Sequence, residues 1–400
     1  MLALYPAFHH LLVTSPVGAE ATMVLPTVER MTAVLYFGLF AMSFDFISGY
    51  TGYLSFGHAA FYGTGAYTVI LIANGAVPLL GSGTPFMLSL LVGGLVAVVL
   101  ALIVGVVSFR LSGVYFAMIT LGFAQVLYVF VRGWDFVARN PRDGPSVSPI
   151  HSEGFQIGVP GVDQLNLAIG ILTGDEVTIL GQTLGGTAVS YYMIGAVVLV
   201  CYFAMQRIVH SPFGRVLIAI RENEERAVAI GYNTYLYKLA AFAISGFFAA
   251  IAGGLFAGFR RSASPENSFY FLTTGDALLS SIIGGFGTLA GPLFGRLFDE
   301  TVREFLSKSG QGGGLLPYLQ ALLGEGALAT PVVGGMTLGG LIDTLLNGHA
   351  SLYVGVVFVL FVLYVPDGLL GTVRSRYGSG TLASAAAERF GSRESGGDET

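Results

Sequence analysis

The chain has 400 residues, of which 54% are hydrophobic and only 11% are charged, and its mean hydropathy is +0.72. Soluble globular domains carry about 25% charged residues, so this composition indicates an integral membrane protein. The formal net charge of −5 argues against a nucleic-acid-binding surface. The single cysteine, Cys201, excludes an intrachain disulfide and a cysteine-based metal cluster.

Long apolar stretches recur along the chain, and about 20 apolar residues suffice to cross a bilayer as a helix. They predict an all-α, polytopic integral membrane protein with about eight to ten transmembrane helices. The second and eighth stretches are short or rich in glycine, which favours broken or re-entrant spans. The candidate spans are residues 31–48, 56–73, 85–109, 113–131, 188–205, 239–259, 277–297, 332–346 and 352–370.

The chain divides into an N-terminal segment (1–30), a membrane domain (31–371) and a cytoplasmic tail (372–400) whose low-complexity sequence predicts disorder. Residues 1–15 lack the basic region of a secretory signal peptide, so we expect the spans themselves to direct insertion. Arginine and lysine are more frequent on one side of the alternating spans. By the positive-inside rule this places the N-terminus outside and the C-terminus in the cytoplasm.

Three polar segments interrupt the membrane domain. Residues 132–187 are expected to form an outer loop, with a hairpin or an amphipathic cap around residues 176–180. Residues 206–238 are expected to form a cytoplasmic loop. Residues 298–330 are expected to form an inner insert that contains a surface-lying helix.

The cytoplasmic loop contains the mixed-charge string S-P-F-G-R-V-L-I-A-I-R-E-N-E-E-R-A-V-A-I-G, which ends at Gly231. On a helix over residues 222–231, Ala227 and Gly231 share the face opposite Glu225. Small residues let another surface approach closely, and a final glycine lets the chain turn back. The spacing therefore predicts a helix that binds a cytoplasmic partner. The alternative is an amphipathic helix held at the membrane–water interface by lipid.

Two glycine-rich strings lie within the apolar stretches, at residues 49–67 and 284–295. Closely spaced glycines permit a break in a membrane helix, and broken helices expose backbone groups to a polar solute. The alternative is close helix packing without contact to a solute. The candidate residues for a helix break or a translocation pathway are Asp45, Gly49, Gly52, Ser55, Gly57, His58, Gly63, Gly65, Gly284, Gly285, Gly287, Gly291 and Pro292.

Asp45 and His58 are the polar groups of most interest in these stretches. An acid facing lipid is costly, so we expect Asp45 to face the bundle near its inner end, where it pairs with Ser55 or His58 or caps the next helix. His58 either lines a pathway or is hydrogen-bonded to a neighbouring carbonyl. Neither residue has the companions that a metal site requires.

The string G-Y-T-G-Y-L-S-F-G-H-A-A-F-Y-G-T-G-A-Y from Gly49 resembles the signature of LivM-type permeases of branched-chain amino acid ABC transporters. Three further blocks resemble that family in the same order, beginning at Arg110, Ser211 and Gly284. The matching parts extend from about Phe44 to Leu370. The R-D-G at residues 142–144, the insert and the tail depart from the family pattern.

The resemblance implies a permease subunit of a binding-protein-dependent importer in the plasma membrane, for branched-chain or related amino acids. The family also includes urea and short-amide permeases, which is the alternative substrate class. Implied partners are a homologous second permease subunit, two ABC ATPase subunits, an extracytoplasmic solute-binding protein and membrane lipid. The residues expected to couple to the ATPase are Arg215, Glu222, Glu225, Ala227 and Gly231.

The sequence contains no catalytic constellation and no metal site. It lacks the G-x-x-x-x-G-K-[ST] motif, so ATP is expected to be used by partner ATPase subunits, with no cofactor bound by this chain. We therefore do not expect an enzyme. A stand-alone secondary transporter or channel would need intramembrane acids for ion coupling, and Asp45 alone supports that alternative.

Overall fold

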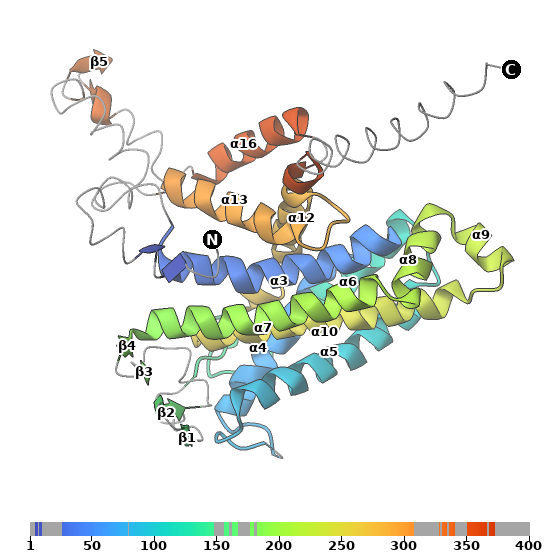
Figure 1. Ribbon diagram of the computed structural model, residues 1–400, viewed down its shortest axis with the longest axis horizontal. Helices are drawn as coiled ribbons and strands as arrows, with labels where there is room; N and C mark the ends of the chain where they lie inside the picture. Colours follow the sequence, from blue (N-terminus) through green and yellow to red (C-terminus); the bar gives the residue numbers. More distant parts are fainter. Residues whose placement is uncertain are drawn as a thin grey trace, which may run out of the picture.

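The computed structural model describes residues 5–6, 8–9, 26–78, 80–147, 156–159, 162–166, 177–179, 182–307, 328, 330–333, 336–340, 350–365 and 368–372. Within them the protein is a bundle of membrane-length helices (Figure 1). Among the described residues, six stretches are long and apolar enough to cross a membrane. They are α3 (Val28–Thr51), α5 (Phe86–Ser108), α6 (Val114–Arg132), α7 (Gly186–Val209), α10 (Thr234–Arg260) and Leu352–Thr372, which overlaps most of α16 (Ala350–Tyr364).

This architecture confirms the prediction of an all-α polytopic membrane protein. A seventh apolar helix, α4 (Ala59–Ala73), is shorter. Helix α3 forms the centre of the bundle, with 94% of its most apolar window buried, and it packs against α10, α13 and α7. Helices α5, α6 and α7 lie at the periphery and expose rows of leucine, valine and phenylalanine, as helices that face lipid do.

Helix α4 is continuous over Ala59–Ala73, so the predicted second span is not broken at Gly63 or Gly65. Its glycines serve close packing instead. A Cβ on Gly63 would lie 2.6 Å from the ring of Phe269, and a Cβ on Gly65 would lie 2.6 Å from the Cα of Ala250 on α10. Gly57, just before the helix, lies against the backbone carbonyl of Thr120. Small residues here let helix backbones approach one another.

A helical hairpin replaces the predicted span 277–297. Helix α12 (Phe271–Gly284) and helix α13 (Gly291–Ser307) are joined by a turn at residues 285–290. Pro292 suits the start of α13 because its missing N–H would be unbonded in the first helical turn. A Cβ on Gly284 would overlap the Gly291 carbonyl, so both glycines let the two helix ends meet. The helix break expected from this second glycine string is therefore present.

Helix α13 runs antiparallel to α3, since Gly38 packs against Leu293 and Arg30 pairs with Glu300 at 3.0 Å. It therefore ends where α3 begins, at the end of the bundle opposite α8 and α9 (Figure 1). Residues 298–307 belong to this helix, so the expectation that the insert begins at residue 298 on the inner side is wrong. The surface-lying helix expected further along falls mainly on residues 308–327, which lie outside the described residues.

Charged residues stabilise the second half of α13 by pairing with one another. Arg296 donates to Asp299 at 2.9 Å and to Glu300 at 2.6 Å, and Arg303 donates to Asp299 at 2.9 Å. The two acids are almost completely buried. Pairs spaced three or four residues apart on a helix lie side by side, so the charges are satisfied along this face.

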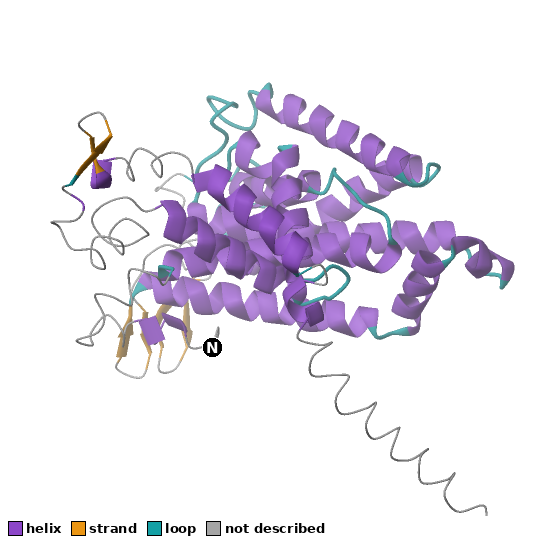
Figure 2. Ribbon diagram, turned by 90° about the horizontal axis from the view of Figure 1, so that it is seen from above, coloured by secondary structure: helices purple, strands orange, loops and turns teal. Residues whose placement is uncertain are grey.

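Short strands lie outside the helical bundle. Strands β1 (Gln156–Val159), β2 (Val162–Asn166), β3 (Val177–Ile179) and β4 (Gln182–Leu184) form an antiparallel sheet before α7. The β3–β4 pair confirms the hairpin expected around residues 176–180. Figure 2 shows the strands gathered at the end of the bundle away from α8 and α9. Strands β5 (Pro331–Val333) and β6 (Met336–Thr337) occupy the start of the predicted span 332–346, which is therefore not one helix.

Candidate functional site

Two short helices project from one end of the bundle, α8 (Pro212–Glu222) and α9 (Glu224–Ala229) (Figure 1). Ser211 caps α8, and the side chain of Asn223 caps α9 by accepting from the Arg226 N–H at 2.8 Å. Asn223 has extended backbone angles, which divides the segment. The prediction of one helix over residues 222–231 is therefore wrong. We call α8 and α9, with the following residues 230–232, the coupling element.

The inner face of the coupling element is apolar. Val216 and Ile220 of α8 and Ala227 of α9 are buried together against Tyr237. Ala227 is only 2% exposed, so it does not share an outward face with Gly231 as the spacing had indicated. Burial of this apolar face fixes the two helices relative to each other and to the start of α10.

The outer face carries the other residues expected to couple to a partner. Arg215, Glu222, Glu225 and Gly231 are all exposed. Gly231 has a φ of +93°, a conformation that glycine adopts readily, and no atom would contact a Cβ there. It therefore turns the chain and does not itself form a close contact within the chain.

Sequence reasoning missed an apolar edge on this element. Val228, Ile230 and Tyr232 are 54%, 68% and 40% exposed, and the polar residues Arg226 and Asn233 flank them in the sequence. Exposed apolar residues rimmed by polar ones are typical of protein interaction sites. The string V-A-I-G-Y was visible in the sequence, but only the kink at Asn223 and the turn at Gly231 show that these side chains face outward.

Arg221 connects the coupling element to the membrane helices. Its Nη1 donates to the Gly49 carbonyl in the last turn of α3 at 2.6 Å, and its Nη2 lies 3.4 Å from Glu222 Oε1. The same Nη1 lies 3.2 Å from where a Cβ on Gly287 would stand. The arginine therefore reaches both the end of α3 and the α12–α13 turn.

Glu224 forms a second connection. Its carboxylate accepts from Tyr53 at 2.7 Å, from Thr234 at 2.9 Å and from Lys238 at 2.5 Å. The Lys238 ammonium also lies 4.6 Å from the centre of the Tyr53 ring. Partial burial raises the pKa of Glu224, but the hydrogen bonds from Lys238, Tyr53 and Thr234 outweigh it and leave that pKa below its usual value.

Asp45 is fully buried, as expected, but its partner differs from the predicted ones. Its Oδ1 accepts from the Gly287 N–H at 2.9 Å, and neither Ser55 nor His58 pairs with it. A Cβ on Gly49 would lie 2.7 Å from the same carboxylate oxygen and 2.8 Å from Gly287 Cα. Asp45, Gly49 and Gly287 therefore meet, although Asp45 and Gly49 precede Gly287 by more than 200 residues in the sequence.

His58 lies away from that cluster, in the core. Its Nε2 is 3.1 Å from Ser245 Oγ and 3.3 Å from Ser43 Oγ, and its ring stacks on Phe40. Two hydroxyl groups thus stand in place of the carbonyl partner that was one of the two alternatives for His58. Ser55 is also completely buried, and Gly52 ends α3 with a φ of +78°.

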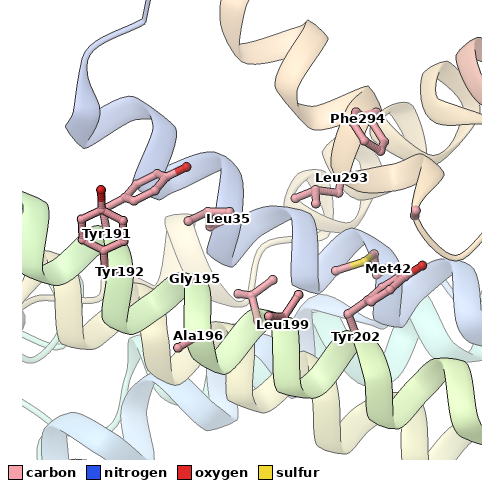
Figure 3. Close-up of a pocket in the computed structure, with 12 residues that line it drawn as sticks. Leu35, Met42, Tyr191, Tyr192, Gly195, Ala196, Leu199, Tyr202, Leu293 and Phe294 are labelled. Atoms are coloured by element: carbon pink, nitrogen blue, oxygen red, sulfur yellow. The ribbon is translucent and has the colours of Figure 1, made fainter. Parts of the chain in front are cut away.

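An apolar groove of about 470 Å³ lies between α3, α7 and α13 (Figure 3). Its walls include Leu35 and Met42 of α3, Tyr191 and Tyr202 of α7, and Leu293 of α13. None of the residues predicted to form the translocation pathway lines this groove. Among the described residues, no group of three or more His, Cys, Asp or Glu side chains could hold a metal ion.

The described residues thus form a multi-pass helical bundle with a polar helical element that projects from one end. The family model of the branched-chain amino acid transport system permease component matches residues 27–312, and the chain belongs to this family.

Two relatives are permease proteins named LivM of high-affinity branched-chain amino acid transport systems. Those of Escherichia coli (strain K12) and Salmonella typhimurium (strain LT2) are 26% and 27% identical over 286 residues. The match covers 70% of this chain and 63% of each relative, so it spans less than two thirds of their length. No solved structure matches the chain.

Proposed function

We propose that this chain is a permease subunit of a binding-protein-dependent ABC importer and forms the translocation pathway for branched-chain or related amino acids. The observation that carries this proposal is the coupling element, which projects from one end and presents Val228, Ile230 and Tyr232 outward. A homologous second permease subunit, two ATPase subunits and an extracytoplasmic binding protein complete the proposed assembly. The chain itself binds no ATP.

In the proposed mechanism, the ATPase subunits bind the coupling element and move it when they close on ATP. The two permease subunits then alternate between outward-facing and inward-facing states. The push requires the coupling element to bind the two ATPase states with different free energies. Since Gly63 and Gly65 of α4 serve packing, the proposed pathway residues are the remaining ones, among which Asp45, Gly49 and Gly287 lie against one another.

Two exposed positions test the role of the coupling element. Glu225→Lys reverses a charge on its outer face, and Gly231→Leu forces a side chain into a φ of +93° and displaces the apolar edge. Both variants should insert at normal levels yet lose transport, with Gly231→Leu the more severe. The measurements are co-purification of the cognate ATPase and amino-acid-stimulated ATP hydrolysis in reconstituted vesicles. Normal docking and normal coupling in both variants would refute this role.

The proposed orientation places the coupling element in the cytoplasm and the β1–β4 sheet outside. Single cysteines at Asn223 and Ser146, both exposed, are suited to test it in a Cys201→Ala background. In intact cells an impermeant maleimide should label position 146 and spare position 223. The opposite pattern would invert the topology.

The alternative solute class is urea or a short amide, because the coupling element is equally compatible with either. Selectivity in such systems depends largely on the separate binding protein. Reconstitution with the cognate binding protein loaded with leucine or with urea distinguishes the two. Uptake of urea alone would refute the amino-acid assignment while leaving the permease assignment intact.

A further inference from the structure

Arg221 lies where three segments of the chain meet: the last turn of α8, the last turn of α3 and the α12–α13 turn. It donates to the Gly49 carbonyl at 2.6 Å. Carbonyls in the last turn of a helix lack intrahelical partners and carry the negative end of the helix dipole, so a guanidinium binds there favourably. Arg221 thus supplies a charge-assisted hydrogen bond between the coupling element and the centre of the bundle.

The α12–α13 turn is joined to the same point from the other side. Asp45 Oδ1 accepts from the Gly287 N–H at 2.9 Å, and there is no room for a Cβ on Gly49 between them. Gly285 and Gly287 both have positive φ, so this turn depends on glycine to keep its shape. A displacement of Gly49 must therefore displace the turn, because backbone lies directly against backbone.

Arg221 is not the sole contact that holds the coupling element against the described part of the bundle. Its side chain is 40% exposed. Helix α8 is anchored by the buried Val216, Leu217 and Ile220, and α9 is anchored by the Glu224–Lys238 pair. The arginine contact is therefore additional to the contacts that fix the fold.

We propose that Arg221 is a positioning residue that transmits movement of the coupling element, through Gly49, to the α12–α13 turn. This inference rests on the proposed function, since it assumes that an ATPase moves the coupling element. Losing a charge-assisted hydrogen bond shifts an equilibrium by about 10- to 100-fold. Without Arg221 the ATPase would still dock and hydrolyse ATP, but the hairpin would no longer follow its movement.

The first experiment measures coupling with Arg221→Gln, Arg221→Lys and the control Arg207→Gln. Arg207 is an exposed arginine near the end of α7, at the same end of the bundle. In reconstituted vesicles Arg221→Gln should co-purify with the cognate ATPase and hydrolyse ATP as the wild type does, yet lose most transport per ATP. Arg221→Lys, which keeps a donor, should recover part of the coupling, and Arg207→Gln should behave as wild type.

The second experiment follows the α12–α13 turn itself. Phe286 in this turn is 46% exposed, so Phe286→Cys in a Cys201→Ala background should react with a maleimide. In the assembled transporter its labelling rate should change between the nucleotide-free state and the state trapped with ATP and vanadate. Adding Arg221→Gln should abolish that change.

The outcomes separate the inference from the proposed function. If the wild-type chain neither binds the ATPase nor transports amino acids, the proposed function fails. If the wild type does both and Arg221→Gln keeps both its transport per ATP and the labelling change, the inference alone is refuted. Loss of ATPase binding or of protein yield in Arg221→Gln would also refute it, because Arg221 would then serve to hold the structure together.

Discussion

Replacing Gly65 with alanine tests how tightly α4 packs on α10. The new Cβ would lie 2.6 Å from the Cα of Ala250 and closer still to its carbonyl. Both contacts are backbone, so no flexible side chain can move aside and the two helices must separate. Gly253 of α10 also packs on backbone, since a Cβ there would overlap the Tyr62 carbonyl of α4.

The magnitude follows by comparison with a matched control. Gly122 lies on the exposed face of α6, where no atom would contact a Cβ. Glycine-to-alanine changes favour a helix by up to about 1 kcal/mol, and this gain is similar in both variants. The difference between Gly65→Ala and Gly122→Ala therefore reports overpacking alone, which costs about 1–3 kcal/mol.

The assay is the free energy of unfolding of the purified protein in detergent micelles, titrated with sodium dodecyl sulfate and followed by circular dichroism. Gly122→Ala should match or exceed the wild type in stability, and Gly65→Ala should fall below Gly122→Ala by the stated amount. Equal stability of the two alanine variants would refute the reasoning, because the backbones of α4 and α10 would then not be in direct contact.

Three further changes have defined outcomes. Because the pKa of Glu224 is lowered in the folded protein, its hydrogen bonds stabilise the protein fully above the ordinary pKa near 4.5, and this stability is lost as pH falls through the lower folded value. Thermal unfolding from pH 7 to pH 3 should show the loss of stability, and Glu224→Gln should remove this dependence on pH. Arg296→Met removes one arginine from Asp299 and Glu300 and should destabilise by about 3 kcal/mol in the same titration, the low end for a broken buried pair because each acid keeps a second arginine. Ile230→Ser should weaken ATPase co-purification about tenfold without lowering protein yield, since an apolar side chain buried at an interface contributes about 1.5–3 kcal/mol.

The helices that face lipid were predictable from the sequence, because hydropathy measures directly what contact with lipid requires. The predicted spans 85–109 and 113–131 match α5 and α6 closely. The same reliance on hydropathy missed the second half of α13, because that half is rich in charged residues. A hydropathy argument counts each charge separately, whereas the structure pairs them along one helix face and leaves no isolated charge among Arg296, Asp299, Glu300 and Arg303.

The two glycine strings show what composition alone leaves open. In the first, helix α4 continues through Gly63 and Gly65 because those residues face a ring and a backbone on neighbouring helices. In the second, Gly285 and Gly287 take positive φ and the helix breaks. Both uses require glycine, so only the position of the neighbouring segments decides between them.

The position of the coupling element was predictable from its mixed charge between two apolar stretches, but its contacts were not. Arg221 and Gly49 are separated by 172 residues, and Tyr53 and Glu224 by 171. Such pairings depend on how α3 and α10 pack. Local spacing also could not show that Asn223 would break the helix and direct Ala227 inward.

The two contacts of the coupling element lie on either side of Gly52, where α3 ends in a left-handed conformation. Arg221 holds the backbone three residues before it, and Glu224 holds the side chain of Tyr53 just after it. The coupling element thus forms hydrogen bonds to the α3–α4 connection on both sides of Gly52. Helix α4 in turn starts with an N–H of Ala59 donated to Thr274 of α12 at 2.8 Å. Helix α12 therefore contacts this connected unit near its beginning through Thr274, and the α12–α13 turn contacts the end of α3 through Gly287. Both ends of α12 are thus tied to the segment that the coupling element contacts.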